Sequence, residues 1–183
     1  MRKFIVVGCD LHDATMVLKV AHQLDEPMTR TIPNDTAGRN RMIGWLRGLA
    51  VEHGEAGIVF AYRASCLGFG LHDELSDAGI ACHVLAPTKI ERSTQGRRNK
   101  NDDRDAARVF ELLRGHVLAG NGRPSVWVPD HATRDDRELV RMRLRLGQQM
   151  TQTKAQVQTL LKRNALVRSK QISAWTKLDR SWL

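Results

Sequence analysis

The sequence predicts an α/β protein in which a mixed sheet carries helices on its faces and a long helical segment follows. Three observations support this fold class. Residues 4–33 contain three short β-rich segments separated by turns, residues 34–85 alternate between helix and strand patterns, and from about residue 133 apolar side chains recur at spacings of three and four. Because hairpin succession produces antiparallel strands and helix–strand alternation produces parallel ones, the sheet is expected to be mixed.

The first three strands are expected in the N-terminal part of the chain. Residues 4–10 form a short apolar run that ends in the carboxylate of Asp10, a pattern typical of a buried strand. Residues 15–23 are rich in β-branched and apolar side chains, and the polar residues between these two runs suit a hairpin turn. A third strand is expected at residues 28–33, after the break that Pro27 introduces.

Helices and strands then alternate. Asn34 or Asp35 is expected to cap the first helix, and Gly79 to end the second. The expected elements in chain order are a helix after residue 35, a strand at 57–62, a helix at 67–78, a strand at 80–85, a polar loop at 93–101, a helix at 102–114, a turn-rich connection at 115–123 and a short extended piece at 125–128. Within that last piece, Trp127 is expected to anchor the core beside its two valine neighbours.

The order of three antiparallel strands followed by αβαβα is that of the ribonuclease-H-like fold. The actin-like ATPase fold shares the same order, so topology alone does not choose a chemistry. An ATPase of that class needs additional phosphate-binding loops, which the sequence does not show. We therefore expect a ribonuclease-H-like domain at residues 1–129, followed by a basic helical or coiled-coil segment at residues 130–183.

The C-terminal segment contains an unusually long helical pattern. Residues 133–169 hold no proline, and a single helix of this length would extend about 55 Å, too far to lie on one small domain. An exposed arm, or a coiled coil that forms a homodimer or higher oligomer, is the favoured interpretation. A helical hairpin that folds back on the domain stays open, and Gly147, Thr153 and Asn164 leave room for a break into two helices.

The charge of the chain indicates an anionic partner. The formal net charge is +9. Residues 1–88 carry 8 basic and 10 acidic side chains, residues 89–133 carry 9 and 6, and residues 134–183 carry 12 and 4, so the positive excess lies in the C-terminal half. This asymmetry favours nucleic acid as the partner over a lipid surface, and no apolar run is long enough to cross a membrane. Three isolated cysteines, at 9, 66 and 82, suit reduced thiols in the cytoplasm.

Three aspartates form a candidate metal site. Asp10 ends the first strand, while Asp102 and Asp105 lie one helical turn apart and project to the same side of their helix. If that helix crosses the first strand, the three carboxylates meet, and oxygen ligands of this kind suit Mg²⁺ or Mn²⁺. Two such ions can hold the attacking and leaving oxygens of a phosphodiester exchange. The alternative is that Asp102 and Asp103 only cap the helix.

Several stretches of the sequence resemble one family. The DEDD insertion-sequence transposases have motifs that are similar to Gly8-Cys-Asp-Leu-His12, to the segment Leu67–Ser93 and to Lys100-Asn-Asp-Asp-Arg-Asp-Ala106. Members of this family have a RuvC-like domain. They include the bridge-RNA-guided recombinases and are related to DNA invertases. The resemblance covers about residues 4–170. It implies a role in DNA transposition and recombination in the bacterial cytoplasm, near the nucleoid, with DNA and a structured guide RNA as partners and Mg²⁺ or Mn²⁺ as cofactor.

The chain departs from the family pattern in two ways. The family's acidic site is Asp-Glu-Asp-Asp, and Asp10, Asp102 and Asp105 match its first, third and fourth places, whereas Arg63 stands at the place of the glutamate. A guanidinium cannot bind a metal but can pair with Asp10 or Asp105 in place of the cation. The resemblance also implies a C-terminal domain with a nucleophilic serine, and no serine here matches its motif, so we expect that domain to be absent from this chain.

Two groups of basic residues are expected to contact nucleic acid. One surrounds the acidic residues and the other lies on the C-terminal helix, and exposed cations of this kind provide affinity for phosphates without regard to base sequence. The candidate binding residues are Lys89, Arg92, Arg97, Arg98, Lys100, Arg104, Arg141 and Arg145. A solvated charged loop and a solvated helix face are the alternatives. The sequence therefore leaves two principal functions, a metal-dependent recombinase subunit and a catalytically inactive fragment that binds RNA or DNA or regulates full-length partners.

Overall fold

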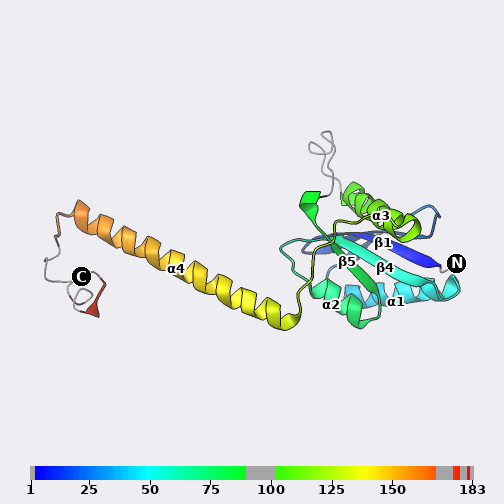
Figure 1. Ribbon diagram of the computed structural model, residues 1–183, viewed down its shortest axis with the longest axis horizontal. Coiled ribbons are helices and arrows are strands. Elements are labelled where there is room, and N and C mark those ends of the chain that lie inside the picture. The colour runs from blue at the N-terminus through cyan, green and yellow to red at the C-terminus, as the bar shows by residue number, and fades with distance from the viewer. Residues whose placement is uncertain (1–2, 90–101, 168–174, 178–180, 182–183) are drawn as a thin grey trace. The chain divides into compact units, whose positions relative to one another are not determined.

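The computed structural model describes residues 3–89, 102–167, 175–177 and 181 (Figure 1). The chain divides into two compact units, Met1–Val128 and Pro129–Leu183. The first unit contains β1 (Phe4–Leu11), β2 (Thr15–His22), β3 (Met28–Pro33), α1 (Thr36–Glu52), β4 (Gly57–Arg63), α2 (Gly70–Asp77), β5 (Ala81–Leu85), the short 3₁₀ helix η1 (Pro87–Lys89) and α3 (Asp102–Ala119). The second contains α4 (His131–Arg163).

The five strands form one mixed sheet in the order β3-β2-β1-β4-β5. β1 lies at its centre, antiparallel to β2 and parallel to β4, and β5 is parallel to β4. The helices cover both faces: α1 and α2 lie on one side, and α3 lies on the other (Figure 1). This is the ribonuclease-H-like architecture, so the predicted fold class is confirmed.

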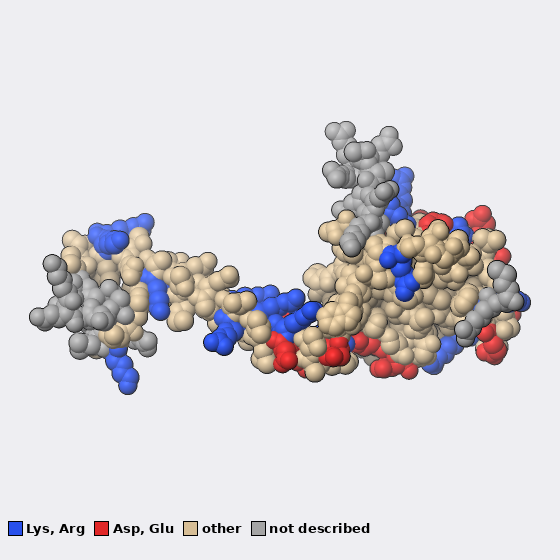
Figure 2. Space-filling model, in the orientation of Figure 1, with Lys and Arg blue, Asp and Glu red and all other residues tan. Residues whose placement is uncertain are grey.

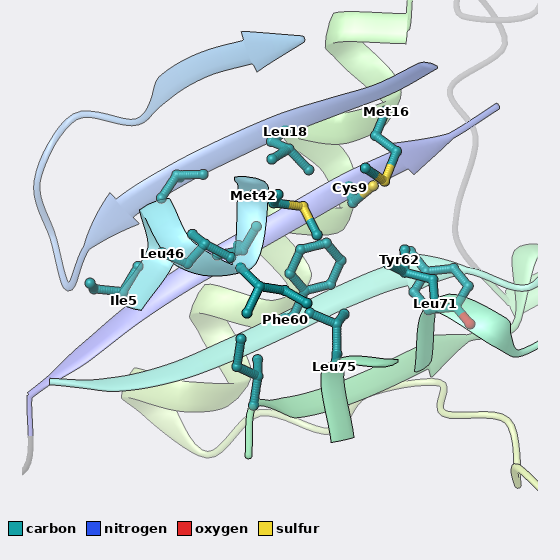
Figure 3. Close-up of a cluster of buried hydrophobic side chains, with 14 of the residues drawn as sticks. Ile5, Cys9, Met16, Leu18, Met42, Leu46, Phe60, Tyr62, Leu71 and Leu75 are labelled. Carbon is teal, nitrogen blue, oxygen red and sulfur yellow. The ribbon is translucent and has the colours of Figure 1, made fainter. Parts of the chain in front are cut away.

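Each face of the sheet has its own core. On the α1 and α2 side, side chains such as Phe60, Tyr62, Met42 and Leu46 form the larger cluster (Figure 3). On the α3 side the cluster is smaller and is formed by Val6, Ala21, Val59, Ala61, Leu85, Val109, Phe110 and Leu113. Since successive side chains of a strand point to opposite faces, the two clusters fix which strand residues point toward α3.

The third helix is longer than the sequence predicted. α3 continues to Ala119, so the expected turn-rich connection at residues 115–123 is wrong for its first five positions. The residue that follows the helix, Gly120, has a φ of 71°, a left-handed conformation that favours glycine. Gly115 is accommodated inside the helix, where an added Cβ would meet the side-chain nitrogen of Asn121 at 3.0 Å.

The segment after α3 shields the edge of the sheet. The amide of Val126 donates to the carbonyl of Val84 on β5, and the side chains of Val126 and Val128 pack against the core. Trp127, between them, is 66% exposed, so the prediction that it anchors the core is wrong. In an extended chain the residue between two inward-facing neighbours points outward, which explains its exposure.

The long C-terminal pattern forms one uninterrupted helix. Asp130 caps α4 by accepting a hydrogen bond from the amide of Thr133 at 2.7 Å. The helix ends after Arg163, with Asn164 as C-cap and Ala165 at a positive φ of 54°, rather than extending to residue 169. The break into two helices is therefore wrong over residues 131–163, and none of the residues of α4 is buried. No helix in the described part of the chain is long and apolar enough to cross a membrane.

Candidate functional site

Strand geometry directs two charged side chains toward α3. On β1, Val6 belongs to the core on the α3 side, so Asp10, four residues later, points to the same side. On β4, Val59 and Ala61 belong to that core, so Arg63 does as well. β1 and β4 are parallel neighbours, with Cys9 paired to Tyr62, and therefore both side chains lie at the carboxyl ends of adjacent strands.

A very close contact holds α3 against the centre of the sheet. A Cβ added to Gly8 would lie 2.3 Å from the backbone nitrogen of Phe110 and 2.4 Å from its Cα. Only glycine permits this approach of helix backbone to strand backbone. The contact brings the beginning of α3 over the end of β1, and Asp105 comes one helical turn before the buried Val109.

Arg63 bridges two of the aspartates. Its Nη2 lies 2.7 Å from Asp10 Oδ1 and 2.9 Å from Asp105 Oδ2. Asp10 is only 4% exposed, and its second oxygen, Oδ2, lies 2.9 Å from His12 Nε2. Burial of the guanidinium lowers the pKa of Arg63, but hydrogen bonds from Arg63 to Asp10 and Asp105, and the charges of both carboxylates, outweigh it and raise that pKa above its ordinary value.

A second bridge lies on the other side of β1. Lys19 Nζ, on β2, is 2.7 Å from Asp103 Oδ1 on α3, and the hydroxyl of Thr29 donates to the same carboxylate at 3.2 Å. The hydrogen bond from Lys19 lowers the pKa of Asp103. The sequence reasoning did not find Lys19 or Thr29, because no local pattern connects them with a carboxylate more than seventy residues away.

A cleft adjoins these charged residues. It has a volume of 370 Å³ and is lined by the turn between β1 and β2 and by the residues that follow β4. Its lining residues are Leu11, His12, Asp13, Ala14, Thr15, Ser65, Cys66 and Leu67. His12 both lines the cleft and contacts Asp10, so the aspartate at the end of β1 lies behind the wall of the cleft.

Comparison with known proteins identifies the family. A model of the DEDD transposases of the IS110 type, described as "Transposase", matches residues 7–165. The chain belongs to this transposase family. A protein of Sinorhizobium fredii (strain NBRC 101917 / NGR234), y4qE, which is named as a transposase, is 33% identical over 127 residues. The match covers 69% of this chain and 30% of y4qE, so the chain spans less than a third of the length of this relative.

Solved structures similar to this DEDD transposase chain include RuvC from Thermus thermophilus, with 11% identity and a TM-score of 0.41 over 67% of the chain and 99% of RuvC. The large terminase nuclease of the thermophilic phage G20c is also similar, with 14% identity and a TM-score of 0.35 over 69% of the chain and 75% of the nuclease.

The residues of this transposase chain do not fit the divalent metal that the DEDD pattern implies. Both oxygens of Asp10 are engaged, one by Arg63 and one by His12, and Arg63 also occupies an oxygen of Asp105. Asp103 is paired with Lys19. Within the described residues, no group of three or more histidine, cysteine, aspartate or glutamate side chains is arranged to hold a metal ion. Asp102 begins α3, and its side chain lies outside the described part of the chain.

The predicted nucleic-acid contacts of this transposase chain fall into two groups. Outside the described residues lie Arg92, Arg97, Arg98 and Lys100. Lys89 is the last residue of η1, and its side chain is also outside the described part of the chain. Arg104, Arg141 and Arg145 have exposed side chains. Arg141 forms an ion pair with Glu138 at 2.6 Å, and both side chains are exposed, which agrees with the alternative of a solvated helix face for that residue. Figure 2 shows Lys and Arg side chains distributed along α4.

Proposed function

We propose that this chain is the RuvC-like, nucleic-acid-binding part of an insertion-sequence transposase, and that it acts in DNA transposition and recombination. The observation that carries the proposal is a row of exposed arginines on α4, in a chain that belongs to the transposase family. Arg137, Arg141 and Arg145 follow each other at intervals of four residues and so share one face of the helix. Such a row suits the regularly spaced phosphates of a nucleic-acid backbone.

We propose DNA and a structured guide RNA as the ligands, following the family resemblance. Phosphate contacts of this kind do not distinguish bases, so specificity would come from other parts of the complex. A protein that acts on chromosomal DNA in a bacterium works in the cytoplasm, and this is the proposed location.

The apolar side chains of α4 support a homodimer. Leu139, Met142, Leu146 and Met150 recur at spacings of three and four and are all more than half exposed. With about 3.6 residues per turn, this apolar stripe lies on roughly the opposite side of α4 from the arginine row. We propose that two copies, or more, associate through the stripe as a coiled coil, which would leave the side of α4 that carries the arginine row exposed.

Of the two functions that the sequence left open, the ion pairs of Arg63 favour the non-catalytic one. A metal-dependent site needs Asp10 and Asp105 as ligands of Mg²⁺ or Mn²⁺, whereas both carboxylates contact Arg63. We therefore propose that this chain binds nucleic acid, or regulates full-length partners, without cleaving DNA strands itself, and that affinity of the site for Mg²⁺ or Mn²⁺ is weakened or lost.

Salt-dependent binding tests the proposal. Fluorescence anisotropy of labelled duplex DNA and of structured RNA, measured across salt concentrations, should give a linear fall of log K with log salt. The double variant Arg141→Gln/Arg145→Gln should reduce the slope by about 2, since each lost phosphate contact removes about 0.9. The control Lys3→Gln/Arg41→Gln removes the same charge from exposed positions of the other unit and should leave the slope nearly unchanged. A flat salt response of the wild-type chain would refute the proposal.

A further inference from the structure

We propose that Arg63 is the resident cation of the acidic site, held between Asp10 and Asp105 in the place of a divalent metal, and that the identity of residue 63 decides whether the site takes such a metal. This inference rests on the part of the proposed function that concerns the lost metal affinity and deepens it, whereas it does not depend on nucleic-acid binding. It concerns how the chain balances its own buried charges.

The contacts of Arg63 are those of a central cation. A single nitrogen, Nη2, lies within 2.9 Å of one oxygen of each carboxylate. The two hydrogens on this nitrogen point in different directions, so one nitrogen serves two carboxylates. The two aspartates would otherwise repel each other, and the positive charge between them removes that repulsion.

Burial makes a cation necessary at this position. Asp10 is 4% exposed, and an ionised carboxylate at that depth is strongly destabilising unless it is paired and hydrogen-bonded. His12 Nε2 contacts one of its oxygens at 2.9 Å, and Arg63 Nη2 contacts the other at 2.7 Å. The guanidinium is always protonated and therefore supplies the charge at every pH at which the protein is folded.

The cation also connects three elements. Asp10 is the next-to-last residue of β1, Arg63 is the last residue of β4, and Asp105 lies in the first turn of α3. The start of the helix is thereby fixed to two neighbouring parallel strands, close to the contact between Gly8 and Phe110. A metal ion bound by carboxylates from the same elements would hold them in the same manner, so Arg63 performs the structural part of a metal's role.

Residue 63 controls the charge balance. With arginine, a divalent cation meets a fixed positive charge and carboxylate oxygens that are already hydrogen-bonded. With glutamate, the same position would add a third carboxylate beside Asp10 and Asp105, and a cluster of oxygen ligands without a cation attracts Mg²⁺ or Mn²⁺. Arg63→Glu should therefore create a site for a divalent metal.

Mn²⁺ binding and thermal unfolding of the full chain test this inference. We expect the wild-type chain to show no Mn²⁺ binding at this site by electron paramagnetic resonance. Its unfolding midpoint should be the same in a chelator as in about 5 mM Mn²⁺, a concentration above the roughly 1 mM dissociation constants of weak oxygen-ligand sites. Arg63→Glu should unfold at a lower temperature in chelator, should bind Mn²⁺, and should recover stability when it does.

Two control variants separate the site from a general effect of charge. Arg63→Gln removes the cation and adds no carboxylate, so it should be destabilised without gaining Mn²⁺ binding. Arg63→Glu/Asp105→Asn should lose the Mn²⁺ binding gained by the single variant. Wild-type Mn²⁺ binding that disappears in Asp10→Asn would overturn the inference, as would a folded Arg63→Glu chain that binds no Mn²⁺. If Arg63→Glu does not fold, the Mn²⁺ titrations of the wild-type chain and of Asp10→Asn still test whether the wild-type site takes a divalent metal. No nucleic acid is present, so this result is independent of the binding assay.

Discussion

Substitution of Gly8 by alanine should displace α3 from the sheet. The added Cβ would lie 2.3, 2.4 and 2.5 Å from the N, Cα and Cβ atoms of Phe110, whereas ordinary contacts of a Cβ are 3.4–4 Å, so the helix has to move by about 1 Å. Overpacking of a core costs about 1–3 kcal/mol, and the upper value applies because backbone atoms cannot rotate away. Movement of α3 also weakens the bridge between Arg63 and Asp105. We expect a loss of about 3 kcal/mol, or about 10 °C in Tm for a unit of this size.

Thermal and urea unfolding followed by circular dichroism measures this loss. The matched control is Gly44→Ala on α1, where an added Cβ meets nothing within 4 Å, so it should be neutral or stabilising by up to about 1 kcal/mol. In a double-mutant cycle, Asp105→Asn should cost less in the Gly8→Ala background than in the wild type, because the displaced helix has already lost part of that ion pair. A Gly8→Ala chain as stable as the wild type, or full additivity with Asp105→Asn, would refute the reasoning.

Two further predictions concern titratable groups. Burial, followed by the charge of Arg123, lowers the pKa of His83 to about 4, so its neutral form favours the folded state, and this contribution is fully present above pH 6.5 and lost as pH falls toward 4. In His83→Gln, the unfolding free energy lost between pH 6.5 and pH 4 should be smaller than in the wild type by about 1–2 kcal/mol, a value that allows for solvent screening of a partly exposed group. An unchanged dependence of the unfolding free energy on pH would count against this prediction. Iodoacetamide at pH 8 should alkylate the exposed Cys66 and should not react with Cys9 or Cys82. Burial raises the thiol pKa of Cys9 well above its usual range and that of Cys82 to about 12. Mass spectrometry should find all three alkylated in urea; equal labelling in the native state would contradict the packing of β1 and β5.

The strands and the sheet were predictable because their signals are local. The apolar runs of β1 and β4 and the hairpin order of the first three strands are visible in the sequence. The face toward which Asp10 and Arg63 point follows from the folded sheet, in which they share the side of Val6, Val59 and Ala61. The end of α3 was not predictable in the same way. Gly115 suggested a turn, but the helix continues until Gly120 adopts a left-handed conformation, which is a property of the folded backbone.

The candidate site was predictable only in part. The possibility that Arg63 pairs with Asp10 or Asp105 followed from the family resemblance, which places this arginine where a glutamate is expected, and the structure has it paired with both. The pairing of Lys19 with Asp103 had no sequence signal, because it depends on how α3 crosses the sheet. Sequence patterns report the geometry of one element at a time, whereas ion pairs between distant elements depend on packing.

The two bridges together explain why α3 begins with several acidic residues. Asp103 and Asp105 are two positions apart, which is a rotation of roughly 200° about the helix axis, so their side chains leave α3 on different sides. α3 packs on β1, and the neighbours of β1 are β2, which carries Lys19, and β4, which carries Arg63. Each neighbouring strand thus contributes one cation to one carboxylate, and carboxylates in the first turn also interact favourably with the helix dipole. Acidic residues at the start of α3 therefore have a structural use in this chain, as partners of cations on the sheet, and their presence alone does not indicate metal-dependent catalysis.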